Sequence, residues 1–472
     1  MFAAKMTRPM APELPVESAR LERTALIVVC LSSFIAPLML SAVNVAIPRI
    51  AADLRADAIQ MSWVPTAYLL TSAALLLPVG KLADMFGRKR LFLIGLTLIT
   101  IASMLASLSQ SIEVLIACRV LQGIGASMLF GTGVAILTSV IPAERRGAAI
   151  GFSVSAVYFG LTFGPLLGGW ATHYLSWRSV FLVHVPLALV NLFIVATMLR
   201  GEWKSEQEQT FDFAGAIFYM ASITGLMYGV SRLPAEGGVV LTAAGIAGIA
   251  AFIRFERRRE SPLFDVQLFF SNRVFTFSFI AALVVYSSTF ATSYLLSLYL
   301  QYLKGMEADA AGLVLISQPL VMALCSPLMG RLSDRYEPRW IASAGLVLMA
   351  AGLGLLASLA DASSVAFVVA ALLTVGLGFA MFSSPNVNAI MGSVDRRHLG
   401  SASASVGTAR VLGQMFSMGV VTVVFAVLMG PVHIDPGSYP VLLDCIRTSF
   451  TVAAALCASA ILFSMARGDM RS

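Results

Sequence analysis

Apolar segments alternate with short charged ones along almost the whole chain. Segments with few or no Lys, Arg, Asp or Glu residues recur from residue 24 to residue 466, and the shortest has 17 residues. About 20 apolar residues let an α-helix cross a bilayer, whereas a strand of a membrane barrel needs only about 10. The fold class is therefore predicted as an all-α polytopic membrane protein with 14 transmembrane helices. These are expected at 24–48, 58–80, 91–112, 114–140, 147–171, 178–199, 213–231, 237–253, 274–303, 310–330, 340–360, 362–384, 399–430 and 446–466.

The composition supports this class. Of the 472 residues, 58% are hydrophobic and only 12% are charged, whereas a soluble domain carries about 25% charged residues. A soluble enzyme, a nucleic-acid-binding protein and a disordered chain are excluded, so the net charge of +7 concerns the loops. The five cysteines are scattered and show no spacing typical of a disulfide framework or a metal site. We expect no metal and no cofactor.

The distribution of Lys and Arg predicts the orientation in the membrane. An even number of spans places both termini on one side. If that side is the cytoplasm, 24 of the 32 Lys and Arg residues lie in inner segments and five in outer loops, as the positive-inside rule requires. We therefore expect a multi-pass protein of the inner or plasma membrane with both termini in the cytoplasm, and a first helix that is retained because its apolar run is too long for a signal peptide.

A weak internal repeat divides the chain. Gly80-Lys-Leu-Ala-Asp84 and Gly330-Arg-Leu-Ser-Asp334-Arg335 share Gly, Leu and Asp at an offset of 250 residues, and twofold repeats are common in transporters. The predicted segments are a cytoplasmic tail (1–23), a six-helix bundle (24–200), a linker with two extra transmembrane helices (201–256), an amphipathic strap on the cytoplasmic face (257–273), a second six-helix bundle (274–466) and a cytoplasmic tail (467–472).

Three motifs in the first half resemble those of the major facilitator superfamily. The segment from Gly80 to Arg90, GKLADMFGRKR, is similar to the signature loop of that family. The segment from Arg119 to Gly125 resembles its helix-4 motif, and Gly160-x-x-x-Gly164-Pro165-x-x-Gly168-Gly169 resembles its helix-5 antiporter motif. Short segments that begin at Trp177 and Phe211 resemble the 14-helix drug:proton antiporter branch.

The resemblance covers nearly the whole chain and implies a fold and a function. The fold is two six-helix bundles plus two inserted helices. The function is export of small amphipathic or hydrophobic, drug-like compounds by alternating access, in exchange for protons. The partners would be the small-molecule substrate, protons and the lipid bilayer, with no nucleic acid, and we expect a monomer. An enzyme is not expected, because no catalytic cluster lies within the apolar segments.

Charge and glycine are concentrated in the signature loop. Asp84 can accept hydrogen bonds from a helix N-terminus and from an arginine across the bundle interface, which would latch the cytoplasmic side shut in one state. Gly80 and Gly87 would permit close helix approach and the turn itself. The alternative is a positively charged inner loop with an incidental Asp. The basic residues of this loop are Arg88, Lys89 and Arg90, and the corresponding second-half loop contains Gly330, Asp334 and Arg335.

Two arginines lie inside apolar helices. An arginine there costs roughly 2.5 kcal/mol or more on insertion scales, so we expect Arg119 to face a cavity and to share a polar face with Gln122 at i+3. The alternative for Arg119 is a side chain that reaches back to the membrane surface. Arg410 either contacts the substrate or forms a salt bridge to a neighbouring helix. The uncharged polar candidates for the substrate cavity, which can equally bond between helices, are Asn44, Gln318, Asn386 and Asn388.

The glycines of the helix-5 motif, Gly160, Gly164 and Gly168, are spaced by four and so share one helix face, next to Pro165, which bends the helix. We expect this smooth face to let a helix of the other half approach closely. The alternative is ordinary packing of small residues within a bundle.

The sequence departs from the family at the position that usually carries protons. Proton-driven exporters of this branch usually have an acidic residue on helix 1, where this chain has Met39. Glu113 is the favoured substitute, because a carboxylate near Arg119 can alternate between an ion pair and a protonated acid. His184 is the second candidate, because a free imidazole titrates near about pH 6.5 and can carry a proton, although a packing histidine is the simpler interpretation. A proton-independent facilitator, or an exporter of a metabolite or lipid, remains the alternative.

Overall fold

The computed structural model describes residues 16–204, 211–257, 269, 271–333, 335–394 and 399–468, and these ranges contain helices and no β-strand. They include 14 helical segments long and apolar enough to cross a membrane, so the 14 predicted spans are confirmed. Eight spans are single unbroken helices of the two halves: α1 (Val16–Leu54), α2 (Ala58–Phe86), α3 (Arg88–Ser107), α4 (Ile112–Val140), α5 (Ala143–Tyr174), α15 (Pro338–Ala357), α16 (Val365–Gly392) and α17 (Leu399–Leu428).

The other six spans comprise the inserted pair and four spans made of joined segments. The inserted pair is α8 (Phe213–Ser231) and α9 (Glu236–Glu256). The joined segments are α6 (Trp177–Val180) with α7 (Val185–Thr197), α11 (Arg273–Thr289) with α12 (Thr292–Leu298) and η1 (Tyr299–Leu303), α13 (Ala308–Leu315) with α14 (Ser317–Ser333), and η3 (Pro436–Ser438) with α18 (Tyr439–Ala466).

Several helices are longer than their charge-free segments. Helix α1 begins at Val16 rather than at residue 24, α16 continues to Gly392 rather than to 384, and α18 begins at Tyr439 rather than at 446. Charged residues are excluded from the hydrocarbon core but not from the helical turns that project beyond it. A search for charge-free segments therefore finds the spans and underestimates the length of the helices.

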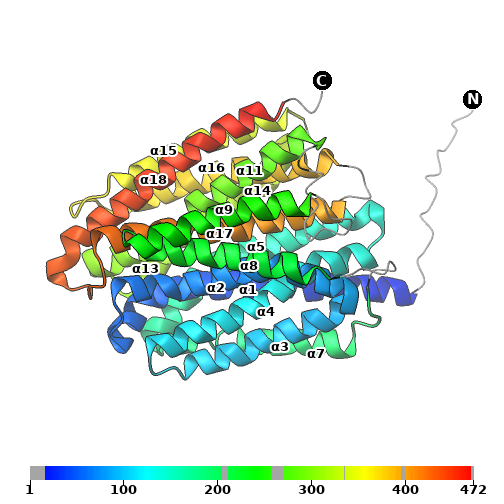
Figure 1. The fold of residues 1–472 in the computed structure, drawn as a ribbon, viewed down its shortest axis with the longest axis horizontal. Helices are drawn as coiled ribbons and strands as arrows, with labels where there is room; N and C mark the ends of the chain where they lie inside the picture. The colour runs from blue at the N-terminus through cyan, green and yellow to red at the C-terminus, as the bar shows by residue number, and fades with distance from the viewer. Residues whose placement is uncertain are drawn as a thin grey trace, which may run out of the picture.

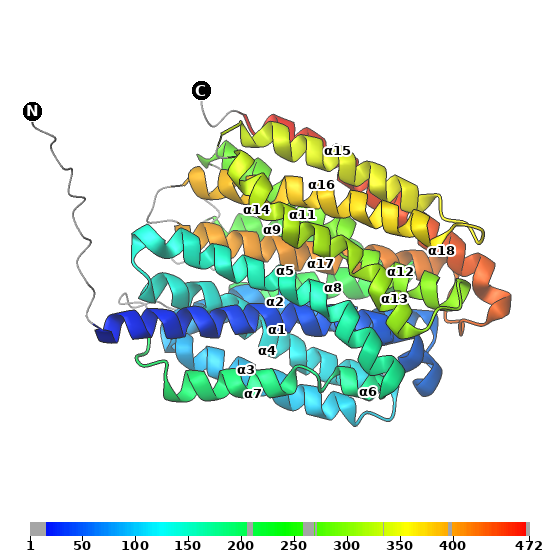
Figure 2. The same ribbon diagram turned by 180° about the vertical axis from the view of Figure 1, so that it is seen from behind.

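The helices form two groups that correspond to the two halves of the sequence. In Figures 1 and 2, α1 to α4 and α7 gather on one side and α15, α16 and α18 on the other, with α5 and α17 near the junction. Helix α5 packs against α1 and also against α13 and α14, and α17 packs against α11 and also against α2. These two helices therefore contact both halves and define the seam between them.

The inserted pair α8 and α9 lies over this seam (Figure 1). Helix α8 packs against α9, α2 and α17, and the Tyr219 hydroxyl donates to the carbonyl of Ala73 at 3.0 Å. In α9 only 17% of the most apolar stretch is buried, compared with 67% in the first helix. The pair therefore covers the outside of the seam, with α9 as the more peripheral member.

The predicted terminal and linking segments are only partly described. Of the predicted strap at 257–273, residues 258–268 and 270 lie outside the described residues, as do residues 1–15 and 469–472 of the two predicted tails. The described part of the C-terminal tail begins with Arg467, which is 1% exposed and donates a hydrogen bond to Asn386 on α16 instead of extending into solvent.

Candidate functional site

Arg119 lies at the centre of a buried polar network in the first half. Its side chain is 0% exposed. The guanidinium donates from Nε to the carbonyl of Val64 at 3.0 Å and from Nη1 to Oε1 of Gln122 at 2.8 Å, and it lies over the ring of Tyr68 at 4.6 Å. The expected polar face shared by Arg119 and Gln122 is present, and the side chain points into the bundle rather than to the membrane surface.

The network continues through two further helices to a histidine. Gln122 Nε2 donates to the hydroxyl of Ser103 on α3 at 2.8 Å, and this hydroxyl lies 2.9 Å from Nε2 of His184, between α6 and α7. His184 is 1% exposed, and its Nδ1 has no hydrogen-bond partner. Sequence reasoning missed Ser103 and Tyr68, because nothing in a helical sequence identifies which small polar residue faces a distant arginine.

The structure does not bring Glu113 to Arg119. Glu113 is exposed in the first turn of α4, where it accepts a hydrogen bond from Gln60 at 3.2 Å. Six residues of α-helix correspond to a rotation of about 240°, which directs the two side chains to different faces. The expected ion pair of these residues is therefore absent from this conformation, and the histidine connected to Arg119 through hydrogen bonds is His184.

Arg410 occupies a different environment, between the two halves. It lies on α17 and is half-buried, and its guanidinium carbon stands 5.6 Å from the ring centre of Phe130 on α4. The charge also lies within electrostatic range of the hydroxyls of Tyr158 on α5 and Tyr286 on α11. No hydrogen bond or ion pair joins Arg410 to any residue in the described part of the chain, so the predicted salt bridge is not formed there.

The signature loop is bonded within the first half. Asp84 accepts from Arg88 at 2.7 and 2.9 Å, and Arg88 donates onward to the carbonyl of Ala135 and the hydroxyl of Ser139 on α4. A side chain at Gly80 would itself meet no heavy atom within 4 Å, but a Cβ added at Gly131 on α4 would lie 3.5 Å from the backbone nitrogen of Gly80, so α2 and α4 approach each other at this position in ordinary van der Waals contact. The latch across the bundle interface stays a prediction for another state.

Gly87 is required where the loop turns. Its φ of 116° is a backbone conformation that favours glycine, and an added Cβ would lie 2.6 Å from the side chain of Glu202. Glu202 accepts from the backbone N–H of Lys89 at 2.8 Å and lies 3.8 Å from the side chain of Arg90. This carboxylate therefore binds the N-terminus of α3, a contact between distant segments that the sequence did not indicate.

The helix-5 glycines pack against their own half, which corrects our expectation. Added Cβ atoms at Gly160, Gly164 and Gly168 would collide with Phe34, Ser41 and Ala42, all on α1. The neighbouring position carries the contact with the other half. A Cβ at Gly169 would lie 2.5 Å from the carbonyl of Ala308 on α13.

The physical reason is the helical rotation of about 100° per residue. Residues spaced by four, such as Gly160, Gly164 and Gly168, lie on one helix face and contact one neighbouring helix, α1. The next residue, Gly169, points to a different neighbour, α13. The carbonyl of Pro165 lies on the side that faces the second half, where it would meet a side chain placed at Gly312 of α13.

Polar contacts reinforce the seam at the end of the bundle that carries Gly169. Arg49 pairs with Glu307 at 2.6 Å, and His173 lies 3.5 Å from the same carboxylate and 3.8 Å from Asp309. Gln301 donates to the carbonyl of Val45 at 2.8 Å. These contacts join the first half to the second at one end of the molecule.

Two of the polar cavity candidates bond inside the second half. Asn386 donates to the carbonyl of Ser278 at 3.1 Å and accepts from Arg467 at 3.3 Å. Burial lowers the pKa of Arg467, beyond the end of the last span, to about 10, so it stays charged at neutral pH. Asn388 donates to the hydroxyl of Ser333 at 2.7 Å. Both asparagines therefore connect helices in this conformation.

The remaining candidates differ in how much the structure shows. Asn44 is 1% exposed and its Oδ1 has no partner, and Gln318 is 8% exposed. In the second-half loop, Gly330 is in ordinary contact with Ser384, at 3.7 Å from an added Cβ, and Arg335 lies in a turn after α14. Asp334 lies outside the described residues.

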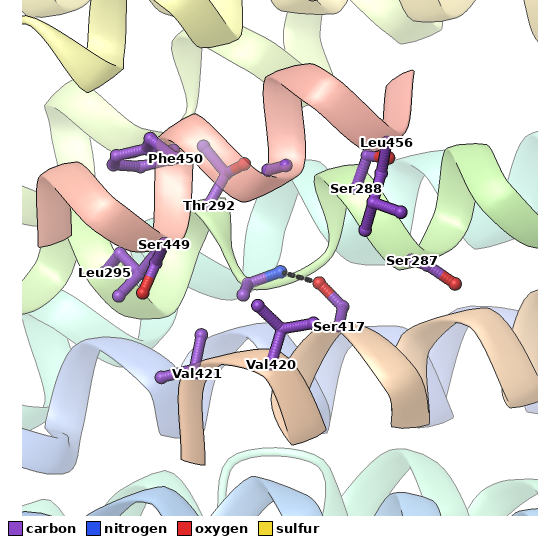
Figure 3. Close-up of a pocket in the computed structure, with 12 residues that line it drawn as sticks. Ser287, Ser288, Thr292, Leu295, Ser417, Val420, Val421, Ser449, Phe450 and Leu456 are labelled. Atoms are coloured by element: carbon purple, nitrogen blue, oxygen red, sulfur yellow. Dashed lines mark hydrogen bonds between the residues drawn. The ribbon is translucent and has the colours of Figure 1, made fainter. Parts of the chain in front are cut away.

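A small pocket lies where the ninth span is interrupted between α11 and α12. The backbone N–H of Ala291, freed by the interruption, donates to the hydroxyl of Ser417 at 3.0 Å. Figure 3 shows this bond beside the side chains of Thr292 and Ser449. The pocket has room for about one water molecule, which is too small for a drug-like substrate. The described residues contain no group of three or more potential metal ligands.

The sequence profile of the Major Facilitator Superfamily matches residues 29–315 and 278–470. The chain belongs to the major facilitator superfamily. It is therefore a multi-pass membrane transporter rather than an enzyme, with the major facilitator fold.

Individual members of the superfamily are similar over most of the chain. The riboflavin transporter RibZ of Clostridioides difficile is 33% identical over 84% of this chain and 86% of its own length. The multidrug resistance protein Stp of Mycobacterium tuberculosis is 30% identical over 81% of this chain and 72% of its own. A crystal structure of a bacterial homologue of the human lysosomal transporter Spinster, inward-facing and unoccupied, has a TM-score of 0.67 at 14% identity and covers 96% of this chain and 98% of that one. This last similarity shows the fold.

Proposed function

We propose that this transporter exports small amphipathic or hydrophobic, drug-like compounds across the inner or plasma membrane by alternating access, in exchange for protons and as a monomer. The observation that carries the proposal is the seam, which polar and close backbone contacts join at one end of the bundle. The hydrogen bonds of Arg88, Arg145 and Asn388 at the opposite end connect residues of the same half. Two rigid halves held together at one end are what alternating access requires.

The orientation follows from the distribution of basic residues. The end joined by Arg49 and Glu307 carries the outer loops with few Lys and Arg residues, and the signature loop lies at the opposite end, the cytoplasmic one. With both termini in the cytoplasm, this conformation is closed to the outside. The printed name of Stp, a multidrug resistance protein, supports drug-like substrates.

For proton coupling, the arrangement favours His184. In the tautomer with the proton on Nε2, this nitrogen donates to Ser103, which keeps its own hydrogen bond to the carbonyl of Ile99 at 2.7 Å. Nδ1 then retains a buried lone pair without a partner, which can accept a proton in a state that opens the site to water. Arg119 is connected to the same histidine through Gln122 and Ser103. A rearrangement of these hydrogen bonds would therefore change the hydrogen bonding of His184.

A proton-independent transporter is the second candidate, and a specific observation favours it. The helix-1 position that usually carries the acid is Met39, which is 1% exposed and packs in the core. The printed name of RibZ, a riboflavin transporter, is compatible with a metabolite as substrate.

Transport into inside-out proteoliposomes tests both functions. A panel of radiolabelled drug-like compounds is measured with an imposed pH gradient and without one. Accumulation that rises with the gradient supports a proton-coupled exporter, and transport that stays the same with and without it supports the facilitator. If no compound of the panel crosses faster than in protein-free vesicles, the proposed drug export is wrong.

A further inference from the structure

We infer that Arg410 binds the negatively charged group of the substrate, and that the preferred substrates are small planar aromatic anions. This inference rests on the proposed function and adds a substrate class to it. The site is the seam cluster, defined as Arg410 together with Phe130, Tyr158, Tyr286 and Phe379.

The first step is the position of the charge. Arg410 follows the start of α17 by 11 residues, which places it about 16 Å into the helix at a rise of 1.5 Å per residue. An arginine at this depth is costly unless it has a partner or faces a polar space. No residue of the described chain donates or accepts a bond with it, so the partner is supplied by something that the transporter binds.

The second step is the sign of the surrounding charges. Each Asp and Glu in a described helix lies within about two turns of a helix end, as Asp53, Glu113 and Asp309 do. Arg410, 11 residues after the start of α17, is the formal charge farthest from a helix end within the described helices, whereas Arg119 and Arg447 lie seven and eight residues after the starts of α4 and α18. Arg119 donates from Nε and Nη1 to Val64 and Gln122, and although its Nη2 has no partner among the described residues, the side chain is 0% exposed and closed off from a ligand in this conformation. The half-buried positive charge of Arg410 favours an anion and disfavours the organic cations that an intramembrane acid would attract.

The third step is the aromatic lining contributed by both halves. Tyr158 and Tyr286 pack edge-to-face on Phe379, with ring centres 6.4 and 5.8 Å apart, and Phe130 lies next to Arg410 itself. Phe130 and Tyr286 are only half-buried, so part of each ring is available for contact. Rings at this geometry accept a further flat ring by stacking or edge contact.

The fourth step is that the cluster crosses the seam. Phe130 and Tyr158 belong to the first half and the other three residues to the second, and the hydroxyls of Tyr158 and Ser383 are 2.6 Å apart across it. A ligand bound here contacts both halves at once. The halves must separate and rejoin during alternating access. A ligand that contacts both halves therefore changes the equilibrium between the two arrangements.

The experiment measures binding of three naphthalene probes that carry a negative charge, no charge and a positive charge. The full-length protein is placed in phosphatidylcholine nanodiscs, which contain no anionic lipid, and titrated calorimetrically with 2-naphthoate, 2-naphthamide and (2-naphthylmethyl)trimethylammonium. We expect 2-naphthoate to bind at least about tenfold more tightly than either other probe, because a charge-assisted hydrogen bond is stronger than a neutral one. Arg410→Gln should remove the difference, and Arg410→Lys should retain part of it.

Arg232→Gln is the matched control. Arg232 also stacks on a tyrosine, Tyr228, at 4.8 Å, but lies exposed just after the end of α8 and is not part of the seam cluster, and its loss should leave all three affinities unchanged. Monodisperse elution and the Arg410→Lys variant guard against misfolding. The inference is wrong if 2-naphthoate does not bind, if the amide or the cation binds as tightly, or if Arg410→Gln binds 2-naphthoate like the parent protein.

Different results would contradict the proposed export function and the inferred anion preference. Gradient-driven transport of neutral or cationic compounds that is unaffected by Arg410→Gln would keep the exporter and remove the anionic preference. Binding of 2-naphthoate that depends on Arg410, without transport of any compound, would support the binding site and remove the exporter.

Discussion

The two arginines inside the membrane, Arg119 and Arg410, have opposite environments. Arg119 is fully buried and bonded to residues of its own half. Arg410 is half-buried, lies between the halves, and touches an aromatic ring of the other half instead of a hydrogen-bond acceptor. The same residue type at similar cost therefore serves two purposes. Under the proposed alternating access, contacts within a half would persist throughout the transport cycle, and contacts across the seam would be made and broken.

The largest difference is expected in stability. Arg119→Met removes the hydrogen bond to Val64 that connects α4 to α2 and the bond to Gln122 within α4, and leaves both acceptors without this donor, so we expect a loss of about 3 kcal/mol. Arg410→Met removes no hydrogen bond to the described chain and should leave stability unchanged. Thermal unfolding in detergent, followed by tryptophan fluorescence, should show a midpoint several degrees lower for Arg119→Met alone. Equal midpoints for the two variants would contradict the comparison.

Two glycines of α5 allow the same comparison, because Gly164 contacts its own half and Gly169 contacts the other half. Gly164→Leu forces a side chain into α1 within the first half, where Leu38 and Ser41 cannot move away, and overpacking of this kind costs about 1–3 kcal/mol or more. We expect a low yield of monodisperse protein. Gly169→Leu instead pushes Ala308 of the other half and should yield folded protein with the outer end open.

Spin-label distances between the exposed positions Arg55 and Pro431, in a background free of the five native cysteines, measure that opening. A longer distance in Gly169→Leu is expected. Normal yield for Gly164→Leu together with an unchanged distance for Gly169→Leu would show that the two positions are equivalent.

Proton coupling gives a smaller and more specific difference. His184→Asn removes a titratable group connected to Arg119 and can keep a hydrogen bond to Ser103, so we expect accumulation driven by a pH gradient to fall at least about tenfold while downhill flux persists. Glu113→Gln changes an exposed residue bonded to Gln60 and should have little effect. Both variants are assayed in proteoliposomes. A larger loss of gradient-driven accumulation in Glu113→Gln than in His184→Asn would restore Glu113 as the proton carrier.

The smallest effect is expected at the outer end of the seam. The Arg49 and Glu307 side chains are 55% and 53% exposed, and exposed ion pairs contribute about 0–1 kcal/mol. Glu307→Gln should therefore change the population of the outward-closed state by about fivefold at most, with the effect decreasing as salt rises. The Arg55–Pro431 spin-label distance distribution at low and high salt measures it. A complete shift to the open state would mean that this pair alone holds the seam.

The sequence by itself determined the spans and the family. All 14 helices could be predicted because the bilayer excludes charges and requires about 20 apolar residues, a constraint that acts locally along the chain. The signature loop, the helix-4 motif and the helix-5 motif also occupy contiguous segments, so their resemblance was sufficient to predict a transporter. Arg119 and Gln122 could be paired because i and i+3 share a helix face.

Only the tertiary structure decided which residues meet across helices. Gly160, Gly164 and Gly168 share a face, but the sequence does not say whether that face meets α1 or the other half. Glu113 is six residues from Arg119 along the chain and points elsewhere, whereas His184 is 65 residues away and connected to it through Gln122 and Ser103. Helix periodicity fixes the direction of a side chain relative to its own helix. The rotation and neighbours of each helix are fixed by packing, and these placed Arg410 among the aromatic rings of both halves.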